Sequence, residues 1–312
     1  MHLPTELAEA IAREAARHDR SALMKAVAAI SNRYQEARPT GRLTDVERAA
    51  YLAVRMPATW AALRVVFDEL RTRLGDASPQ SMLDLGAGPG TTIWAAAESF
   101  PNLDEITCVE HNPDFIALGK ALAPRQARWI EGDVRSTPFP PADFVVLSYA
   151  AGELDAPNAL IHRAWAAAGL ALVMVEPGTP RGFATIRAAR DSLIQAGAAI
   201  AAPCPHAAAC PMKDPDWCHF AARLERTRLH RQLKGGDLGH EDEKFSYVIA
   251  SRTPVQPAEA RIVRHPWTEP GLVRLELCGP SGLRTLVVRK RDASAFRQAR
   301  KSHWGGEWRE IS

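Results

Sequence analysis

A glycine-rich loop between two apolar segments constrains the fold of this chain more than any other feature. Residues 82–92 read MLDLGAGPGTT, so a short apolar strand at 82–86 leads through three glycines into a helix predicted over Thr91–Ser99. Glycine lets the backbone turn sharply and approach a ligand, and the first turn of a helix presents unpaired N–H groups. The segment therefore predicts a strand–loop–helix unit that binds a cofactor.

Apolar strand patterns alternate with helical patterns after this loop. Further strands are predicted at 105–112, 127–134, 143–154 and 170–182, with helices between them, and residues 245–251 return as another strand. Strands that alternate with helices form βαβ units and a parallel, doubly wound sheet. Right-handed crossovers then bring the carboxyl ends of the parallel strands to one edge, where ligands bind.

The two ends of the chain have different patterns. Residues 1–78 carry apolar residues at helical spacing, with an interruption expected at Met56-Pro57, and short strands with turns follow Pro254. We therefore predict an α/β protein in three parts. A helical region spans 1–78, a Rossmann-like domain spans 79–254 with a cysteine segment (203–220) inserted, and a small basic β module spans 255–312.

Acidic residues follow the predicted strands at the same edge as the glycine loop. Asp84 precedes the glycines, Glu110 ends the next strand, where a carboxylate can bind both ribose hydroxyls, and Asp133 ends the third. A glycine loop alone is weak evidence, because dinucleotide sites look alike. The series DLGAGPG, VEHN and EGDV, however, resembles the class I S-adenosylmethionine-dependent methyltransferases over roughly residues 80–180.

This resemblance implies a class I methyltransferase fold and a site for S-adenosylmethionine. By position, the expected cofactor-binding residues are Asp84, Gly86, Gly88, Gly90, Glu110 and Asp133. A Rossmann-like domain whose pocket no longer serves catalysis stays open as an alternative, because a fold does not by itself imply an activity.

The place of a methyl acceptor is less well marked. Amino-methylating members of the class carry an Asn/Asp-Pro-Pro-Tyr/Phe motif after the fourth strand, where this chain reads LSYAAGELD (147–155). Tyr149 could stack on a base or cofactor, and Glu153 could act as a base or cap the next helix; both are weak candidates for catalysis. Methyl transfer depends mainly on proximity and in-line geometry, so missing acid–base residues do not exclude it.

Four of the five cysteines form an uneven pattern. Thiolates bind soft metals, and structural zinc favours short paired C-x₂₋₄-C spacings, whereas the looser C-x₅-C-x₇-C here suits a [4Fe–4S] cluster better, with zinc as the alternative. His206 and His219 are substitute ligands, Cys108 is expected to be a buried core thiol, and an unrelated set of cysteines stays open. The predicted metal ligands are Cys204, Cys210, Cys218 and Cys278.

A second resemblance rests on EPGTPRG (176–182), the CPH, CP and WCHF series, the arginine-rich helix expected after it, and EDEKFSY (241–247). Together they resemble the methyltransferase-like family that assembles the small ribosomal subunit, which includes a mitochondrial small-subunit protein and bacterial homologues. The likeness covers nearly the whole chain from residue 40. It implies that the four cysteines hold a [4Fe–4S] cluster and that the protein works with small-subunit rRNA.

The predicted function is therefore that of an S-adenosylmethionine-binding, iron–sulfur methyltransferase-like protein that acts on or assembles the small ribosomal subunit. Two alternatives remain: a non-catalytic RNA-binding assembly factor, and a zinc-stabilised methyltransferase that acts on a protein or small molecule. Methyl transfer itself, the acceptor and the oligomeric state are not predicted.

Charge and hydropathy bear on partners and location. Residues 255–312 hold 11 Lys/Arg and six Asp/Glu, an excess of five positive charges on a body that is otherwise close to neutral. Such an excess suggests a polyanion partner, with a merely solvated charged face as the alternative. No apolar run approaches the ~20 residues that span a bilayer, so no membrane association is expected. The acidic residues near the N-terminus predict a cytoplasmic protein without a leader.

Overall fold

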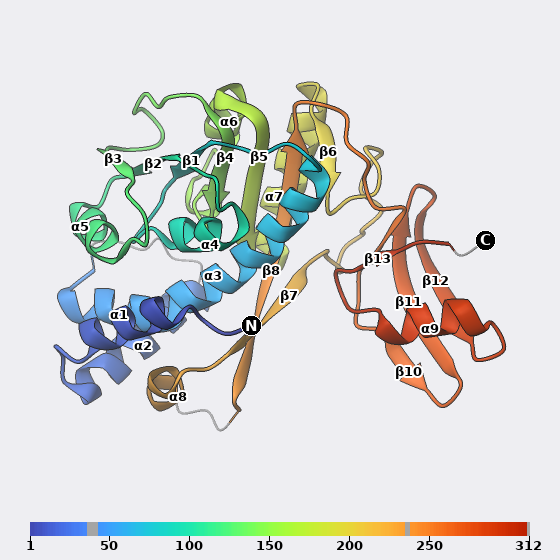
Figure 1. Cartoon of the computed structure of the whole chain (residues 1–312), viewed down its shortest axis with the longest axis horizontal. Coiled ribbons are helices and arrows are strands. Elements are labelled where there is room, and N and C mark those ends of the chain that lie inside the picture. The colour runs from blue at the N-terminus through green and yellow to red at the C-terminus, as the bar shows by residue number, and fades with distance from the viewer. Residues whose placement is uncertain (36–42, 235–237, 311–312) are drawn as a thin grey trace.

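The computed structural model describes residues 1–35, 43–234 and 238–310; parts of the predicted helical region (36–42) and of the segment before EDEKFSY (235–237) lie outside them. Figure 1 shows a large body built on one sheet, with helices at the N-terminal end and a smaller C-terminal module on the opposite side. The predicted α/β architecture with a helical extension and a small β module is confirmed. Among the described residues, no helix is long and apolar enough to cross a membrane.

The larger sheet contains eight strands, in the order β3-β2-β1-β4-β5-β8-β6, with β7 also paired to β8. Strands β1 to β5 are mutually parallel, whereas β8 runs antiparallel to β5, β6 and β7. The strands are β1 Ser81–Leu85, β2 Glu105–Glu110, β3 Arg128–Glu131, β4 Ala142–Ser148, β5 Ala168–Pro177, β6 Ala199–Ala202, β7 Phe220–Glu225 and β8 His240–Ser251.

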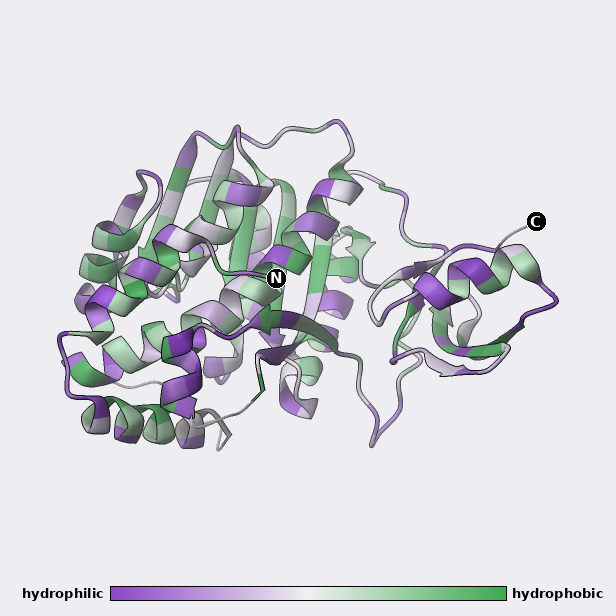
Figure 2. Cartoon of the chain, turned by 60° about the horizontal axis from the view of Figure 1, so that its bottom comes forward, coloured by the Kyte–Doolittle hydropathy of each residue, from purple (hydrophilic) through white to green (hydrophobic). Residues whose placement is uncertain are grey.

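Helices cover both faces of this sheet, and the strands are apolar on both sides for that reason. In β4, Phe144 and Val146 pack toward one face while Val145 and Leu147 pack toward the other, as the two-residue period of a strand requires. The green central strands in Figure 2 show this continuous apolar character. One face packs against α3 Asp45–Leu74, α4 Thr91–Ser99 and α5 Pro113–Leu122, and the other against α6 Asn158–Ala167 and α7 Pro180–Gln195.

The long helix α3 joins the N-terminal region to the sheet. Thr44 and Glu47 form a capping box at its start, and the N-terminal helices α1 Thr5–Ala15 and α2 Arg20–Gln35 pack against it. The interruption expected at Met56-Pro57 is wrong, because α3 continues through Pro57. A proline inside a helix costs about 3 kcal/mol. The turns around Pro57 are buried, and we attribute the continuity of α3 to this tertiary packing.

Two other expectations need correction. The strand predicted at 143–154 ends at Ser148 and is followed by the 3₁₀ helix η1 Ala151–Glu153. The arginine-rich helix expected after the cysteines is present as the short helix α8 Arg228–Lys234, but the basic stretch begins in strand β7, which contains Arg223. Arg223 faces Asp242 on β8 and binds it, Nε to Oδ1 at 2.8 Å, so cross-strand pairing determines the structure of the basic stretch.

The cysteine segment leaves the sheet between two strands that share one neighbour. Both β6 and β7 pair with β8, β6 at residues 249–251 and β7 at residues 240–245. Residues 203–219 therefore form an excursion from one edge of β8, and the hydroxyl of Ser246 donates to the carbonyl of Cys218 at 2.8 Å. This arrangement holds both ends of the cysteine segment against the same strand.

The C-terminal module is a separate antiparallel sheet with its own apolar core. One side of the sheet packs against helix α9 Ala293–Lys301, through residues such as Val273, Leu275 and Val288. The strands are β9 Ala260–Ile262, β10 Trp267–Glu269, β11 Leu272–Gly279, β12 Gly282–Arg289 and β13 Glu307–Trp308.

Candidate functional site

A cavity of about 240 Å³ opens over the glycine loop at the carboxyl ends of the parallel strands. Gly86, Gly88 and Gly90 have φ values of 76°, 53° and 79°, in the left-handed region that favours glycine. A side chain at Gly86 would also place its Cβ 2.8 Å from Cβ of Ala150. The loop thus needs its glycines both for its turn and for its close approach to the strand β4 end.

Two of the predicted cofactor-binding carboxylates are buried: Glu110 lines this cavity, whereas Asp84 does not. Glu110 accepts hydrogen bonds from the backbone N–H groups of Gly88 and Asn112, each at 2.8 Å, so it ties the loop to the end of β2. Burial raises the pKa of Asp84 to about 7; Thr92 opposes this rise and Glu110 adds to it. Thr92 makes no well-formed hydrogen bond to Asp84, and both carboxyl oxygens lack a partner among the described residues.

The third carboxylate, Asp133, lies half-buried in the lining of the cavity. It accepts from the side chain of Arg135, Nε to Oδ2 at 2.9 Å, and from its backbone N–H at 2.8 Å. These hydrogen bonds lower the pKa of Asp133 to about 2. A ligand in this cavity therefore meets an ionised carboxylate that is already paired with a guanidinium.

Residues that sequence reasoning did not select also line this cavity. Tyr51 and Thr59 reach it from α3, and Phe115 reaches it from α5. The ring centroids of Tyr51 and Phe115 lie 5.3 Å apart. Residues on α3 precede the glycine loop by about thirty positions and belong to an ordinary helical pattern, so nothing local in the sequence marks them as part of a pocket.

Tyr149 and Glu153, the two weak candidates for catalysis, both line this cavity but differ in their contacts. Tyr149 has a φ of 56°, the one positive φ outside glycine among the described residues. Its hydroxyl donates to Oε1 of Glu243 at 3.1 Å, and Arg55 binds the same oxygen at 3.2 Å. Glu243 belongs to EDEKFSY, so this motif contacts Tyr149 in the segment after β4, where other members of the class carry their acceptor motif. Glu153 is exposed on η1 at the cavity rim.

Another buried carboxyl, Glu176 at the end of β5, was not predicted as a site residue. It accepts from the backbone N–H of Gly152 at 3.0 Å, and burial raises its pKa to about 7. It supports the turn that carries Glu153. Glu176 is the first residue of EPGTPRG, so this position of the motif has a structural role.

A second cavity brings the four predicted metal ligands together. Cysteines from the cysteine segment (203–220) and from strand β11 line it, and Sγ of Cys278 lies 3.7 Å from Nε2 of His206. Burial raises the pKa of Cys278 to about 12, and the thiols of Cys204 and Cys210 add to that rise. The cysteines at this cavity are Cys204, Cys210, Cys218 and Cys278.

The fifth cysteine and the second histidine lie elsewhere. Cys108 is fully buried in β2, as expected for a core thiol. His219 stacks on Trp217, with ring centroids 5.1 Å apart, and contacts Trp304 of the C-terminal module edge-on at 4.8 Å. His219 therefore belongs to an aromatic contact beside the cavity rather than to its lining.

Two buried arginines flank the cysteine cavity. Arg190, on α7, donates to the backbone carbonyls of His206 and Ala208 at 2.8 and 2.7 Å, and so holds the cysteine loop. Arg261, on β9, donates to the carbonyls of Pro203 at 3.0 Å and Gly305 at 2.9 Å. Cationic side chains on both sides favour negative charge within the cavity.

Arg261 also joins the C-terminal module to the body. It is only 2% exposed and pairs with Glu69 of α3, Nη2 to Oε1 at 2.6 Å. Although burial opposes it, the guanidinium groups of Arg261 and Arg73 lower the pKa of Glu69 below its usual range. Arg261 of the module thus binds the long helix through its ion pair with Glu69 and the cysteine loop through its hydrogen bond to Pro203.

Replacing Glu69 by glutamine is expected to lower the free energy of unfolding by about 3 kcal/mol, because it leaves Arg261 buried without its counter-ion. The lowered pKa of Glu69 means that its contribution is present at neutral pH and is lost as the pH falls below about 4. Urea unfolding at pH 7 and pH 3.5 would measure both effects. Glu9→Gln, which removes an exposed pair with Arg13, is the matched control and should change nothing. Equal stability of wild type and Glu69→Gln at pH 7 would contradict the role of this pair.

The described residues contain no group of three His, Cys, Asp or Glu side chains close enough to hold a single metal ion. The four thiols surround a shared cavity without converging on one point. The predicted ligand set therefore remains a prediction, as do the cofactor contacts of the glycine-loop cavity.

The sheet order with one reversed strand inserted beside β5, together with a glycine loop after β1, defines the class I methyltransferase fold. Residues 45–309 match the family model described as mitochondrial small ribosomal subunit Rsm22, and the chain belongs to this Rsm22 family. The predicted resemblance is confirmed at this level.

Two curated relatives and one solved structure are similar to this chain. The human "Ribosome assembly protein METTL17, mitochondrial" is 28% identical over 92% of this chain and 67% of its own length. "Rsm22-cox11 tandem protein 2, mitochondrial" of Schizosaccharomyces pombe is 26% identical over 85% of this chain, which spans only 43% of that protein. Magnesium protoporphyrin IX methyltransferase from Synechocystis with bound S-adenosylmethionine has a TM-score of 0.42 at 14% identity, over 71% of this chain and 90% of its own.

The prediction of a cytoplasmic protein is wrong. The family is described as mitochondrial, and both curated relatives carry the same location in their names. The prediction rested on acidic residues near the N-terminus. In the structure most of these residues belong to α1, whose Leu7 and Ile11 are buried against the N-terminal core, so they are part of a folded helix and carry no information on the compartment.

Proposed function

We propose that this chain is an assembly factor of the small ribosomal subunit that binds S-adenosylmethionine over its glycine loop and a [4Fe–4S] cluster through its four cavity cysteines. The observation that carries the proposal is the meeting of four cysteines, two of them 60 positions apart in the chain, at one cavity between the body and the C-terminal module. Membership of the Rsm22 family, and similarity to a human protein named for ribosome assembly, support the assembly role.

The glycine-loop cavity suits a cationic cofactor with a ribose. Asp84 has two buried oxygens without a partner, and Glu110 retains lone pairs beyond the backbone bonds it accepts. The loop itself carries no lysine or arginine that would serve a phosphate. When bound, S-adenosylmethionine supplies a sulfonium methyl group; Gly86, Gly88 and Gly90 would position it, and Asp133 would face its base.

The cysteine cavity suits a cluster better than a single ion. Zinc at about 2.3 Å from four sulfurs requires those sulfurs to lie about 3.8 Å apart. In a four-iron cluster each thiolate binds a different iron, so the four cysteine sulfurs can lie farther apart than around a single zinc ion. The cluster with four thiolates carries net negative charge, which Arg190 and Arg261 would offset. Its chemistry there would be structural, because the ligands link the module to the body.

The acceptor side favours an assembly role over methyl transfer. Tyr149 occupies the place of the usual acceptor motif, and its hydroxyl is engaged by Glu243, which Arg55 also binds. A substrate that entered here would have to displace this half-buried network. The rival function is that of an rRNA methyltransferase, whose acceptor would reach the cavity past Glu153.

Anaerobic purification followed by iron, sulfide and zinc analysis tests the cluster, and sedimentation with small ribosomal subunits tests the assembly role. About four irons and four sulfides per chain are expected. One zinc per chain without iron would support the zinc-stabilised alternative. Transfer of a labelled methyl group from S-adenosylmethionine to small-subunit rRNA would establish the rival catalytic function.

Binding to rRNA should depend strongly on salt, because the Lys/Arg excess of the module would release counterions from phosphates. Substituting Arg289, Lys290 and Arg291 together by glutamine is expected to reduce the slope of log affinity against log salt by about one unit per lost contact. A triple variant of Arg13, Arg20 and Lys25, which lie on the N-terminal helices at the far end of the body, is the control. Filter binding between 50 and 300 mM salt, roughly, would measure the slopes. If both triple variants kept the wild-type slope, the module's charges would serve only to solvate it.

A further inference from the structure

One face of the C-terminal sheet is left open. The strand register places Trp267 opposite Arg274, and Arg274 opposite Val287, so these three side chains form a row across β10, β11 and β12. Leu272 and Arg289 form the next row. Helix α9 packs against the other face (Figure 1), so within the described residues 255–310 no element of the module covers this row.

This open face gathers apolar side chains that a folded protein usually buries. Six large hydrophobic residues are exposed among the described residues, and three of them lie on this sheet face. Trp267 is 49% exposed, Leu283 is 44% exposed and Val287 is 40% exposed. A grouped set of exposed apolar side chains indicates an interaction surface.

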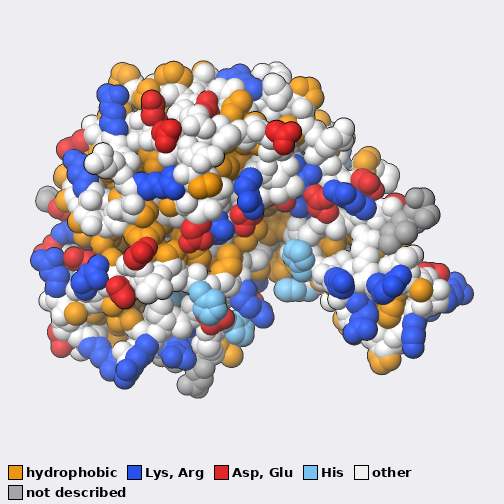
Figure 3. Space-filling model, viewed as in Figure 1, with side chains coloured by type: hydrophobic (Ala, Val, Ile, Leu, Met, Phe, Trp, Pro, Cys, Tyr) orange, Lys and Arg blue, Asp and Glu red, His pale blue; other side chains and the backbone are white. Residues whose placement is uncertain are grey.

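The side chains of this face are of the kinds that stack on nucleic-acid bases, namely an aromatic ring and a guanidinium group. The guanidinium of Arg274 lies 4.7 Å from the ring centroid of Trp267, so a planar cation and a large aromatic ring already stack on each other. Arg289 ends β12 in the row next to that of Trp267 and Arg274, and Lys290 and Arg291 follow it in the turn after the strand. Figure 3 shows Lys and Arg side chains spread over the visible side of the module as well.

The acidic side chains of the face do not cancel this character. Glu276 accepts a hydrogen bond from the hydroxyl of Thr285 at 2.9 Å, and Glu269 lies at the hairpin end of β10. The module keeps an excess of five positive charges over residues 255–312.

We propose that this face binds unpaired nucleotides of RNA, with a base stacked on Trp267 and Arg274 and the flanking phosphates on Arg289, Lys290 and Arg291. The proposal rests on the proposed function and assigns its RNA contact to one surface and one form of RNA. Bases in a duplex are stacked on each other and present no ring face, whereas unpaired bases stack on aromatic and guanidinium planes. Combined apolar, aromatic and cationic side chains fit single strands better than an A-form helix, which is read through its phosphates and 2′-hydroxyls.

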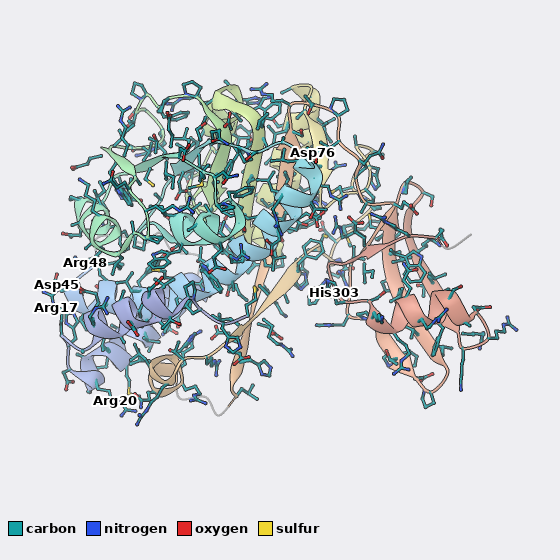
Figure 4. The ribbon with its side chains drawn as sticks, viewed as in Figure 1. Arg17, Arg20, Asp45, Arg48, Asp76 and His303 are labelled. Atoms are coloured by element: carbon teal, nitrogen blue, oxygen red, sulfur yellow. The ribbon has the colours of Figure 1, made fainter. Side chains whose placement is uncertain are left out.

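The position of the face relative to the cysteine cavity supports a fixed platform. Cys278 and Leu283 form the last row of the same face, and Cys278 lines the cysteine cavity. Figure 4 shows His303 on the side of the module that faces the body. The sheet is therefore anchored at one end and open at the other.

Fluorescence anisotropy with a labelled mixed-sequence RNA of about twelve nucleotides tests the proposal, with the same strand annealed to its complement as the second probe. Wild type is expected to bind the single strand at least about tenfold more tightly than the duplex. Trp267→Ala should weaken single-strand binding by about tenfold, and Trp267→Phe, which keeps a ring, should restore most of it. Arg297→Ala with Arg300→Ala, on the helix side of the module, is the matched control and should cost less than about threefold. Circular dichroism confirms that each variant is folded.

The outcomes separate this proposal from the function on which it rests. If wild type binds the single strand and Trp267→Ala binds it equally well, the platform is wrong and the RNA-binding function stands. If wild type binds neither RNA but still sediments with small subunits, both the platform and the RNA contact are overturned. If Trp267→Ala loses only its association with the subunit and keeps both RNA affinities, the face is a protein-docking surface and the proposal fails.

Discussion

Replacing Gly88 by arginine is expected to abolish S-adenosylmethionine binding, with an affinity at least about 100-fold weaker than that of wild type, or about 3 kcal/mol. Gly88 lines the glycine-loop cavity, and nothing lies within 4 Å of the position where its Cβ would stand. The arginine side chain would therefore extend into the cavity without a clash in the core. Its φ of 53° adds about 1 kcal/mol of backbone strain. Isothermal titration calorimetry on both proteins measures the effect.

A matched control separates blockage from strain. Gly197 also has a positive φ, 83°, and open space at its Cβ position, but it follows α7 outside the cavity. Gly197→Arg should therefore lose a similar amount of stability and keep the wild-type affinity. Binding that is equal in wild type and Gly88→Arg would show that the cofactor, if bound, sits elsewhere; no binding by wild type would remove the cofactor from the proposed function.

Replacing Cys278 by alanine is expected to empty the cluster site and loosen the C-terminal module. Cys278 is the one cavity cysteine that belongs to the module, so it would be the only ligand to cross the junction. Iron should fall from about four per chain to near zero. Proteolysis between β8 and β9 should become at least about tenfold faster, because local opening of the module exposes that connection.

Cys108→Ala is the control for the loss of a buried thiol. Cys108 is fully buried in β2 and does not line the cysteine cavity. The variant should be less stable, by about 1 kcal/mol, but should retain the full iron content. If Cys278→Ala kept both its iron and its resistance to protease, Cys278 would not be a ligand and the module would be held by other contacts, such as those of Arg261.

Local sequence signals predicted the parts of this fold that are made by neighbouring residues. The glycine loop, the carboxylates at the strand ends and the short strands of the C-terminal module all lie where the patterns place them. Each of these features is determined within about ten residues, since turns and strand periods are local properties. The grouping of the four cysteines is different: it followed from a resemblance, because spacing alone left zinc, a cluster and an unrelated set open.

Long-range contacts account for what the sequence did not predict. Glu243 meets Tyr149 across 94 positions, and Arg261 meets Glu69 across 192. Neither pairing leaves a local pattern, because the two partners lie on segments that are far apart in the sequence. The continuity of α3 through Pro57 has the same cause. Propensity argues for a break, and burial against other elements overrides it.

The order in which the strands are made has a consequence for the cysteine site during synthesis. Strands β6 and β7, on either side of the cysteine loop, have β8 as their sheet neighbour, and β8 is made after both. At typical elongation rates the ribosome needs roughly two to seven seconds to pass from Cys218 to Ser251, and roughly three to twelve to reach Cys278. Until β8 has been made, the thiols of Cys204, Cys210 and Cys218 lie on a loop whose flanking strands, β6 and β7, have no partner strand. The cavity can therefore close only when nearly the whole chain has been made, which places loading of any metal group at the end of synthesis.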